Sequence, residues 1–167
     1  VTILSYGGII KEINVPDKNG KIENIVLKYE NNFEYLNDTF FIGALIGRYA
    51  NRIENGTFVL NNKIINLERN EGKHHLHGGS NGFHKNHWDL KKYDNLENKF
   101  LELSFMSNHL DCGYPGNLKC SVKYSLNDLN EFNIEFYGIS DADTIFNPTS
   151  HSYFNLNPSE NSIFEHY

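Results

Sequence analysis

The chain of 167 residues is poor in cysteine, in long apolar runs and in positive charge. Its two cysteines, Cys112 and Cys120, are too few for a disulfide framework in a chain of this size, so we expect a reducing compartment, the cytoplasm. The longest apolar stretch, residues 40–46, is interrupted by Gly43 and is far too short to span a bilayer, so no membrane is expected as partner. The formal net charge is -6, and no basic stripe is present to displace phosphate counterions, which excludes nucleic acid.

Tryptophan and methionine occur once each, whereas there are ten Tyr and twelve Phe, and aromatic residues favour strands. Short segments with period-two alternation recur along the chain, separated by Gly, Asn and Asp, while no helical stripe is present. The pair Asn61-Asn62 tolerates positive φ and predicts a two-residue hairpin between 57–60 and 63–67. The remaining predicted elements are strands at 23–29, 88–93, 100–106, 118–125 and 132–138, and one short turn at 31–38. The pattern predicts an all-β antiparallel sandwich, forming one domain or part of one.

One long segment, residues 70–86, has no alternation and carries glycines that let the backbone approach a ligand closely. A long loop in a compact β protein is usually functional or disordered, and the glycines favour function. It contains four of the eight histidines, His74, His75, His77 and His84. We expect most of the eight to lie on the surface.

Two histidines stand among Gly, Pro, Asn or Ser rather than in apolar runs, namely His77 and His151. Imidazoles in such settings suit proton movement near neutral pH. Asn51 and Arg52 add an amide and a guanidinium fork, so the combination suits a ligand rich in hydroxyl groups. Taken alone, Arg52 is more often a surface salt bridge or loop anchor. Arg48 is expected to be structural and, in a regular strand, to share the face of Arg52.

Other chemistries receive less support from the sequence. His75 and His77 have the spacing with which one strand face can present two metal ligands, but glycines follow where a glutamate would be needed, so no metal is expected. A serine nucleophile elbow is missing. Cys112 is interpreted as a turn residue rather than a nucleophile.

Five motifs then follow one another in a specific order: residues 47–53 with 55–58, Leu76-His77-Gly78-Gly79, 82–88, 113–118 and 147–156. In order and spacing they closely resemble the aldose 1-epimerase family, also called galactose mutarotases. The resemblance implies a galactose mutarotase-like β-sandwich that interconverts the α and β anomers of galactose, glucose and similar aldohexoses, without metal or organic cofactor.

The resemblance also implies residue roles. His151 would be the general acid that protonates the ring oxygen, and His77 its partner in holding that oxygen. Asn51 and Arg52 would bind sugar hydroxyls, and Tyr153 would form part of the pocket wall. Arg52 close to both imidazoles would lower their pKa values, so a neutral His77 could donate a hydrogen bond without becoming the acid.

Members of this family are about twice as long, and the resemblance places their general base, a glutamate, and a substrate-binding aspartate in the C-terminal half. Glu160 and Glu165 have no matching context, so neither is assigned as the base. We therefore expect 1–167 to be the N-terminal part of a single sandwich domain, nearly inactive alone, with the rest of the same protein or a second chain completing it. The alternatives are a non-catalytic carbohydrate-binding sandwich, a hexose-6-phosphate epimerase relative and a purely structural β module.

Overall fold

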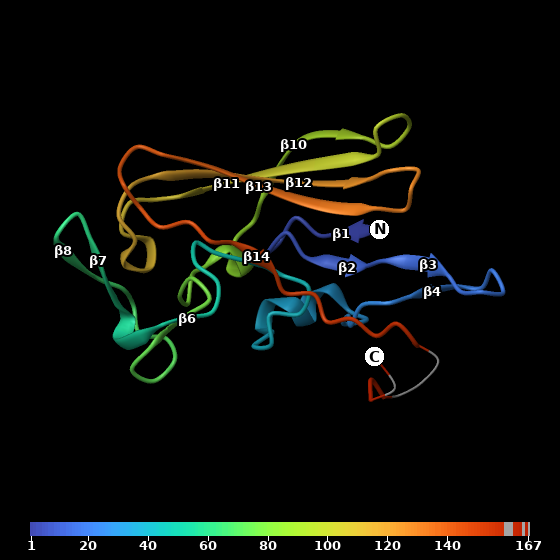
Figure 1. Cartoon of the computed structure of the whole chain (residues 1–167), viewed down its shortest axis with the longest axis horizontal. Coiled ribbons are helices and arrows are strands. Elements are labelled where there is room, and N and C mark those ends of the chain that lie inside the picture. Colours follow the sequence, from blue (N-terminus) through green and yellow to red (C-terminus); the bar gives the residue numbers. More distant parts are fainter. Residues whose placement is uncertain (159–161, 165, 167) are drawn as a thin grey trace.

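The computed structural model describes residues 1–158, 162–164 and 166, so Glu160 and Glu165 lie outside the described residues. In this part of the chain, strands alternate with short 3-10 helices (Figure 1). The helices are η1 (Asn32–Asn37), η2 (Glu54–Gly56), η3 (Phe83–Lys85) and η4 (Asp111–Gly113). None of the helices in the described ranges is long and apolar enough to cross a bilayer.

The largest sheet has four antiparallel strands in the order β10-β11-β12-β13 and forms the upper layer in Figure 1. Its strands are β10 (Asp89–Asp94), β11 (Phe100–Ser107), β12 (Leu118–Leu126) and β13 (Phe132–Ser140). Alternate residues of β12 are buried, Leu118, Cys120, Val122 and Tyr124. The period-two pattern of the sequence therefore turns one face of this sheet toward the core.

The other strands form two-stranded antiparallel ladders that lie below this sheet in Figure 1 or, for β7 and β8, at its left-hand end. The pairs are β1 (Thr2–Ile3) with β2 (Ile10–Glu12), β3 (Asn14–Pro16) with β4 (Ile22–Asn24), β5 (Leu45–Ile46) with β14 (Thr149–Ser150), β6 (Arg52–Ile53) with β9 (His75–Leu76), and β7 (Thr57–Leu60) with β8 (Lys63–Asn66). The fold is an antiparallel β-sandwich, as the sequence predicts.

The main core lies between these layers. Leu103 and Val122 of the sheet pack in one cluster with Ile10 and Leu45 of the opposite layer and with Trp88, which precedes β10. Burial of each such side chain contributes about 1.5–3 kcal/mol. A hydrogen bond also crosses between the layers, because the Tyr124 hydroxyl donates to the carbonyl of Gly8 at 2.6 Å.

The predicted hairpin is confirmed, with φ of 50° at Asn61 and 61° at Asn62 between β7 and β8. The predicted strand over 23–29 is wrong beyond Asn24. The side-chain carbonyl of Asn24 accepts hydrogen bonds from the backbone N–H groups of Ile13 and Val26, at 3.0 and 3.3 Å. Its side chain thus takes the place of a ladder partner, and the regular strand ends there.

Candidate active site

Three segments that are far apart in the sequence meet beside β5, β6 and β9, and they carry Asn51, His77 and His151. His151 follows β14 and pairs with the end of the loop before β5, donating its N–H to Ala44 at 2.8 Å and accepting from Gly43 at 3.1 Å. His77 follows β9 and donates its N–H to the Asn51 carbonyl at 3.0 Å. The two imidazole rings consequently lie against each other, with centroids 5.1 Å apart and planes at 84°.

A hydrogen bond from the chain itself sets the protonation of His77. The backbone N–H of Asn51 donates to His77 Nδ1 at 2.9 Å, so Nδ1 is an acceptor and the neutral ring carries its proton on Nε2. Burial lowers the pKa of His77 to about 4, and the neighbouring His151 and Arg52 add to the effect. At neutral pH His77 is therefore uncharged and offers one N–H donor.

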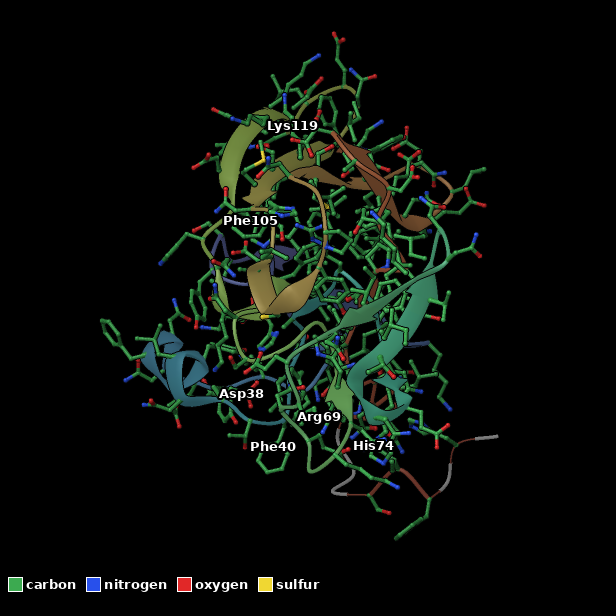
Figure 2. All side chains as sticks on the ribbon, turned by 90° about the vertical axis from the view of Figure 1, so that its left-hand side faces the viewer. Asp38, Phe40, Arg69, His74, Phe105 and Lys119 are labelled. Carbon is green, nitrogen blue, oxygen red and sulfur yellow. The ribbon has the colours of Figure 1, made fainter. Side chains whose placement is uncertain are left out.

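The ring of His151 differs from that of His77 in its hydrogen bonding. Its ring nitrogens make no hydrogen bond to any residue in the described ranges, and both remain available to a ligand. The ring is half-buried and packs against Tyr153 at 5.1 Å. The Tyr153 hydroxyl donates to the carbonyl of Phe40 at 2.8 Å, which fixes this ring next to His151. Figure 2 shows Phe40 and Asp38 toward the lower end of the molecule, with Lys119 near the top.

Arg52 is held by a carboxylate. Its Nη2 and Nε donate to Glu71 at 2.9 and 3.2 Å, a two-point contact that lowers the pKa of Glu71. Its Nη1 lies 3.4 Å from the side-chain oxygen of Asn51. Both Asn51 and Arg52 are exposed, so an amide and a guanidinium stand at the surface beside His77.

Arg48 does not share a strand face with Arg52, which corrects that expectation. Asn51 has a φ of 64°, so the strand turns between them, leaving Arg48 buried and Arg52 exposed. The Arg48 side chain makes six hydrogen bonds, to Ser107 Oγ, Thr144 Oγ1 and the carbonyls of Ser107, Asn108, Pro115 and Gly116. Its structural role is confirmed.

Two of the eight histidines, His75 and His84, are buried, so they are exceptions to the expectation that most lie on the surface. His75 donates from Nδ1 to the Glu68 carbonyl and accepts the Tyr114 hydroxyl on Nε2, both at 2.7 Å. Because both ring nitrogens are occupied, His75 and His77 do not form a two-ligand metal face. Cys112 lies in the η4 turn, as predicted, and burial raises the pKa of its thiol to about 11.

The sequence also missed two neighbours of the site, Glu71 and Phe41. Glu71 lies 19 positions from Arg52 in a turn, and no local motif marks it as a partner. Phe41 belongs to an apolar run that reads as core, yet its ring contacts His77 at 4.9 Å and His151 at 5.7 Å.

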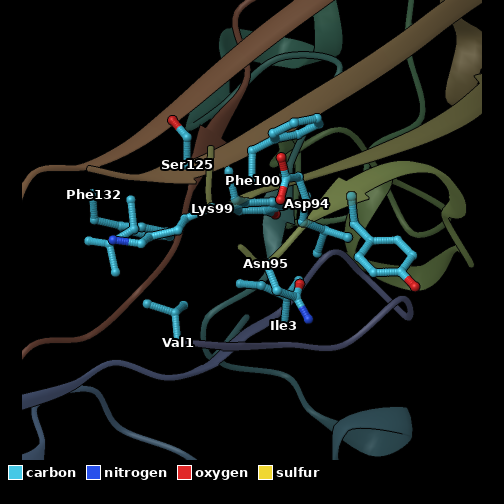
Figure 3. A pocket seen from close by; sticks show the side chains of 12 residues that line it. Val1, Ile3, Asp94, Asn95, Lys99, Phe100, Ser125 and Phe132 are labelled. Carbon is cyan, nitrogen blue, oxygen red and sulfur yellow. The ribbon is translucent and has the colours of Figure 1, made fainter. Parts of the chain in front are cut away.

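A cavity of ≈ 400 Å³ opens elsewhere, between β1, the β10–β11 turn and the ends of β12 and β13 (Figure 3). No histidine is among the described residues that line it. The Asn98 amide and turn N–H groups lower the pKa of Asp94 to about 2, and Lys99 pairs with Asp128. These charged groups hold turns, so the histidine pair remains the better candidate for proton transfer.

Comparisons with known proteins match this chain to one family. A family model described as aldose 1-epimerase matches residues 1–167. The chain is 45% identical over 120 residues to an aldose 1-epimerase of Haemophilus influenzae, covering 72% of this chain and 34% of that protein. It is 38% identical over 167 residues to a galactose mutarotase of Sus scrofa, covering 99% and 47%.

Solved structures resemble it as well. An aldose epimerase homologue from C. elegans superposes with a TM-score of 0.87 at 34% identity, covering 93% of this chain and 47% of that one. A galactose 1-epimerase from Lactobacillus acidophilus superposes with a TM-score of 0.82 at 32% identity, covering 92% of this chain and 45% of that one. The chain thus spans about half the length, or less, of the relatives it matches.

Proposed function

The chain belongs to the aldose 1-epimerase family, and from this we propose that it forms the histidine-bearing part of an enzyme that interconverts the α and β anomers of galactose, glucose and similar aldohexoses. The observation that carries the proposal is the contact between His77 and His151 at 5.1 Å. The His77 ring is a fixed neutral donor, and the nitrogens of the His151 ring are unoccupied as far as the described residues go.

Mutarotation needs two proton movements on one pyranose. The ring oxygen gains a proton as the hydroxyl on the anomeric carbon loses one, and the bond between that carbon and the ring oxygen breaks to give the open aldehyde. Rotation of the aldehyde about one bond and reclosure on its other face, with both protons returned, completes the exchange. Each general catalyst contributes on the order of 10²–10⁴ in rate.

We assign His151 as the general acid that gives the proton to the ring oxygen and takes it back. His77 donates its Nε2–H to the same oxygen and keeps that proton, because its pKa of about 4 leaves no second proton to give at neutral pH. Asn51 and Arg52 bind hydroxyls of the sugar, and Glu71 holds the guanidinium in place. Tyr153 forms the wall beside the acid. This chemistry requires no metal or organic cofactor.

The base that accepts the proton of the anomeric hydroxyl is a carboxylate supplied by polypeptide beyond this chain. Residues 1–167 are then the N-terminal part of one sandwich domain, completed by the rest of the same protein or by a second chain. The share of the relatives that the chain covers, about half or less, supports this assignment. A cytoplasmic location fits the two unpaired cysteines, Cys112 and Cys120.

A phosphorylated hexose is a poorer substrate on this geometry. Arg48 is buried and fully engaged by its six hydrogen bonds, and Arg52 is paired with Glu71. Lys85 donates to the carbonyls of Leu36 and Asp38, at 3.3 and 3.0 Å. These three cations near the site thus have partners already.

Polarimetry of α-D-galactose tests the proposal. The native protein that contains this sequence should accelerate mutarotation, whereas residues 1–167 alone should stay near the buffer rate because the base is missing. His151→Asn in the native protein should lose at least about 10²-fold in rate. If residues 1–167 alone accelerated mutarotation as strongly as members of the family do, the result would contradict the assignment of the base. Sugar binding by a native protein without any acceleration would indicate a non-catalytic module.

A further inference from the structure

Phe41 has an unusual backbone for a large side chain. Its φ is 58°, in the left-handed region that residues with a Cβ rarely adopt. Two other non-glycine residues of the site, Asn51 and His77, have φ of 64° and 53°. Left-handed non-glycine residues persist where the surroundings enforce them, and they cluster at functional sites.

The surroundings of Phe41 enforce this conformation from both sides. The carboxylate of Asp38 accepts the N–H groups of Phe40 and Ile42, at 2.9 and 2.8 Å. Ala44 donates to the Phe41 carbonyl at 3.1 Å, and Tyr153 donates to the Phe40 carbonyl at 2.8 Å. The backbone is therefore pinned at each residue next to Phe41.

The pinned ring lies among three imidazoles. Its centroid is 4.9 Å from that of His77, 4.8 Å from that of His84 and 5.7 Å from that of His151. His84 is buried, and its Nδ1 has no hydrogen-bond partner in the described part of the chain, so packing rather than a polar contact holds its ring. Phe41 thus joins a buried imidazole to the two imidazoles of the site.

We propose that Phe41 is a positioning residue, whose ring holds His77 and His151 in their perpendicular contact and excludes water from that side of the pair. The inference rests on the proposed function for its catalytic meaning, but the packing itself is independent of the sugar. Edge-to-face contacts of this kind are directional, so an aliphatic side chain of similar size does not replace them.

Exclusion of water has a measurable consequence at His77. Burial is the main cause of its low pKa, with smaller effects from His151 and Arg52. His84, behind the ring, is faced by Lys85 and Asp38. Removing the Phe41 ring leaves these charges in place and readmits water, so the pKa of His77 should rise toward its ordinary value.

The test is an NMR titration of the histidine rings in the native protein that contains this sequence, carrying Phe41→Leu. We expect the His77 midpoint to rise by at least about one pH unit and to return in Phe41→Tyr, which keeps the ring. Phe33→Leu is the matched control, because Phe33 is 75% exposed in η1 and, among the described residues, makes no ring contact with an imidazole. Phe41→Gly is measured alongside, since glycine accepts the left-handed backbone. In the native enzyme, Phe41→Leu should lower kcat roughly 10–100-fold with little change in KM.

An unchanged His77 midpoint in a folded Phe41→Leu or Phe41→Gly variant would overturn the proposal. Unfolding of both variants would overturn it too, since Phe41 would then serve stability rather than positioning. A wild-type protein that shows the low His77 midpoint and the Phe41→Leu shift, yet no mutarotation, would overturn the proposed function and still support the role of Phe41.

Discussion

The two imidazoles of the site differ because of one main-chain hydrogen bond. The N–H of Asn51 occupies Nδ1 of His77, while the ring nitrogens of His151 have no hydrogen-bond partner within the described ranges. A second proton on His77 would have to displace that N–H and would be placed in a half-buried position. The proposed function therefore assigns different tasks to two residues of the same type, one as a fixed donor and one as the exchanging acid.

Glu71→Gln tests whether the carboxylate positions Arg52. A glutamine accepts one hydrogen bond where the carboxylate accepts two, so the guanidinium loses its fixed orientation, and the dissociation constant for galactose should rise about 3–10-fold. Stability should change little, because exposed ion pairs contribute about 0–1 kcal/mol. Sugar titrations by NMR and thermal unfolding measure both quantities.

Glu23→Gln serves as the control, because it breaks another surface ion pair, between Glu23 of β4 and Lys21, at 2.7 Å. It should leave sugar binding unchanged. Equal affinities for the wild type and Glu71→Gln would show that Glu71 has no positioning role.

Local motifs are enough to single out His77, His151, Asn51 and Arg52, because their neighbours in the sequence are unusual for a strand or a core. Glu71 and Phe41 cannot be found this way. Glu71 matters only because β6 and β9 pair, and Phe41 only because the chain bends at a left-handed residue. Tertiary pairing and backbone strain leave no mark in a short window of sequence.

Among the elements, those governed by turn chemistry or alternation are predictable. The β7–β8 hairpin follows from two adjacent asparagines, and the long strands β11, β12 and β13 follow from period-two alternation. The two-residue strands β5, β6, β9 and β14 are too short to show a period, although they carry the site. They exist because neighbouring segments offer them partners.

Gly78→Ala tests how closely the loop after β9 packs. Gly78 has a φ of 87°, and an added Cβ would lie 1.6 Å from the carbonyl oxygen of Gly47. The loop or the segment before Arg48 must move, so we expect the free energy of unfolding to fall by roughly 3 kcal/mol. Urea titration measures this loss.

Gly72→Ala, in the turn before β9, is the matched control. Its φ is 58°, but nothing lies within 4 Å of an added Cβ. It should cost only about 1 kcal/mol, the price of the left-handed backbone. Equal losses for the two variants would mean that the contact with Gly47 does not restrain the loop.

At the scale of the whole molecule, buried imidazoles make the free energy of unfolding depend on pH. Burial lowers the pKa of His84 to about 4, against an ordinary value of 6.5. The His84 ring binds a proton more readily in the unfolded chain than in the folded one. Its contribution to the free energy of unfolding is therefore complete above about pH 6.5 and is lost as the pH falls toward 4. His77 acts in the same direction.

Chemical denaturation at pH 7.5 and pH 5 measures this loss. His84→Leu removes one such group, so the wild type should lose about 2 kcal/mol more than the variant between these pH values. His87→Leu removes an exposed imidazole and should behave as the wild type does. A pH dependence that His84→Leu leaves unaltered would contradict the burial of this ring.

Arg48 has a consequence for how sequences of this fold can diverge. Four of its six hydrogen bonds end on main-chain carbonyls, which every amino acid possesses. The segment from Ser107 to Gly116 can thus exchange many of its side chains over evolutionary time while its path stays the same. Substitution is therefore constrained at Arg48, whereas the side chains of the loop around it can vary.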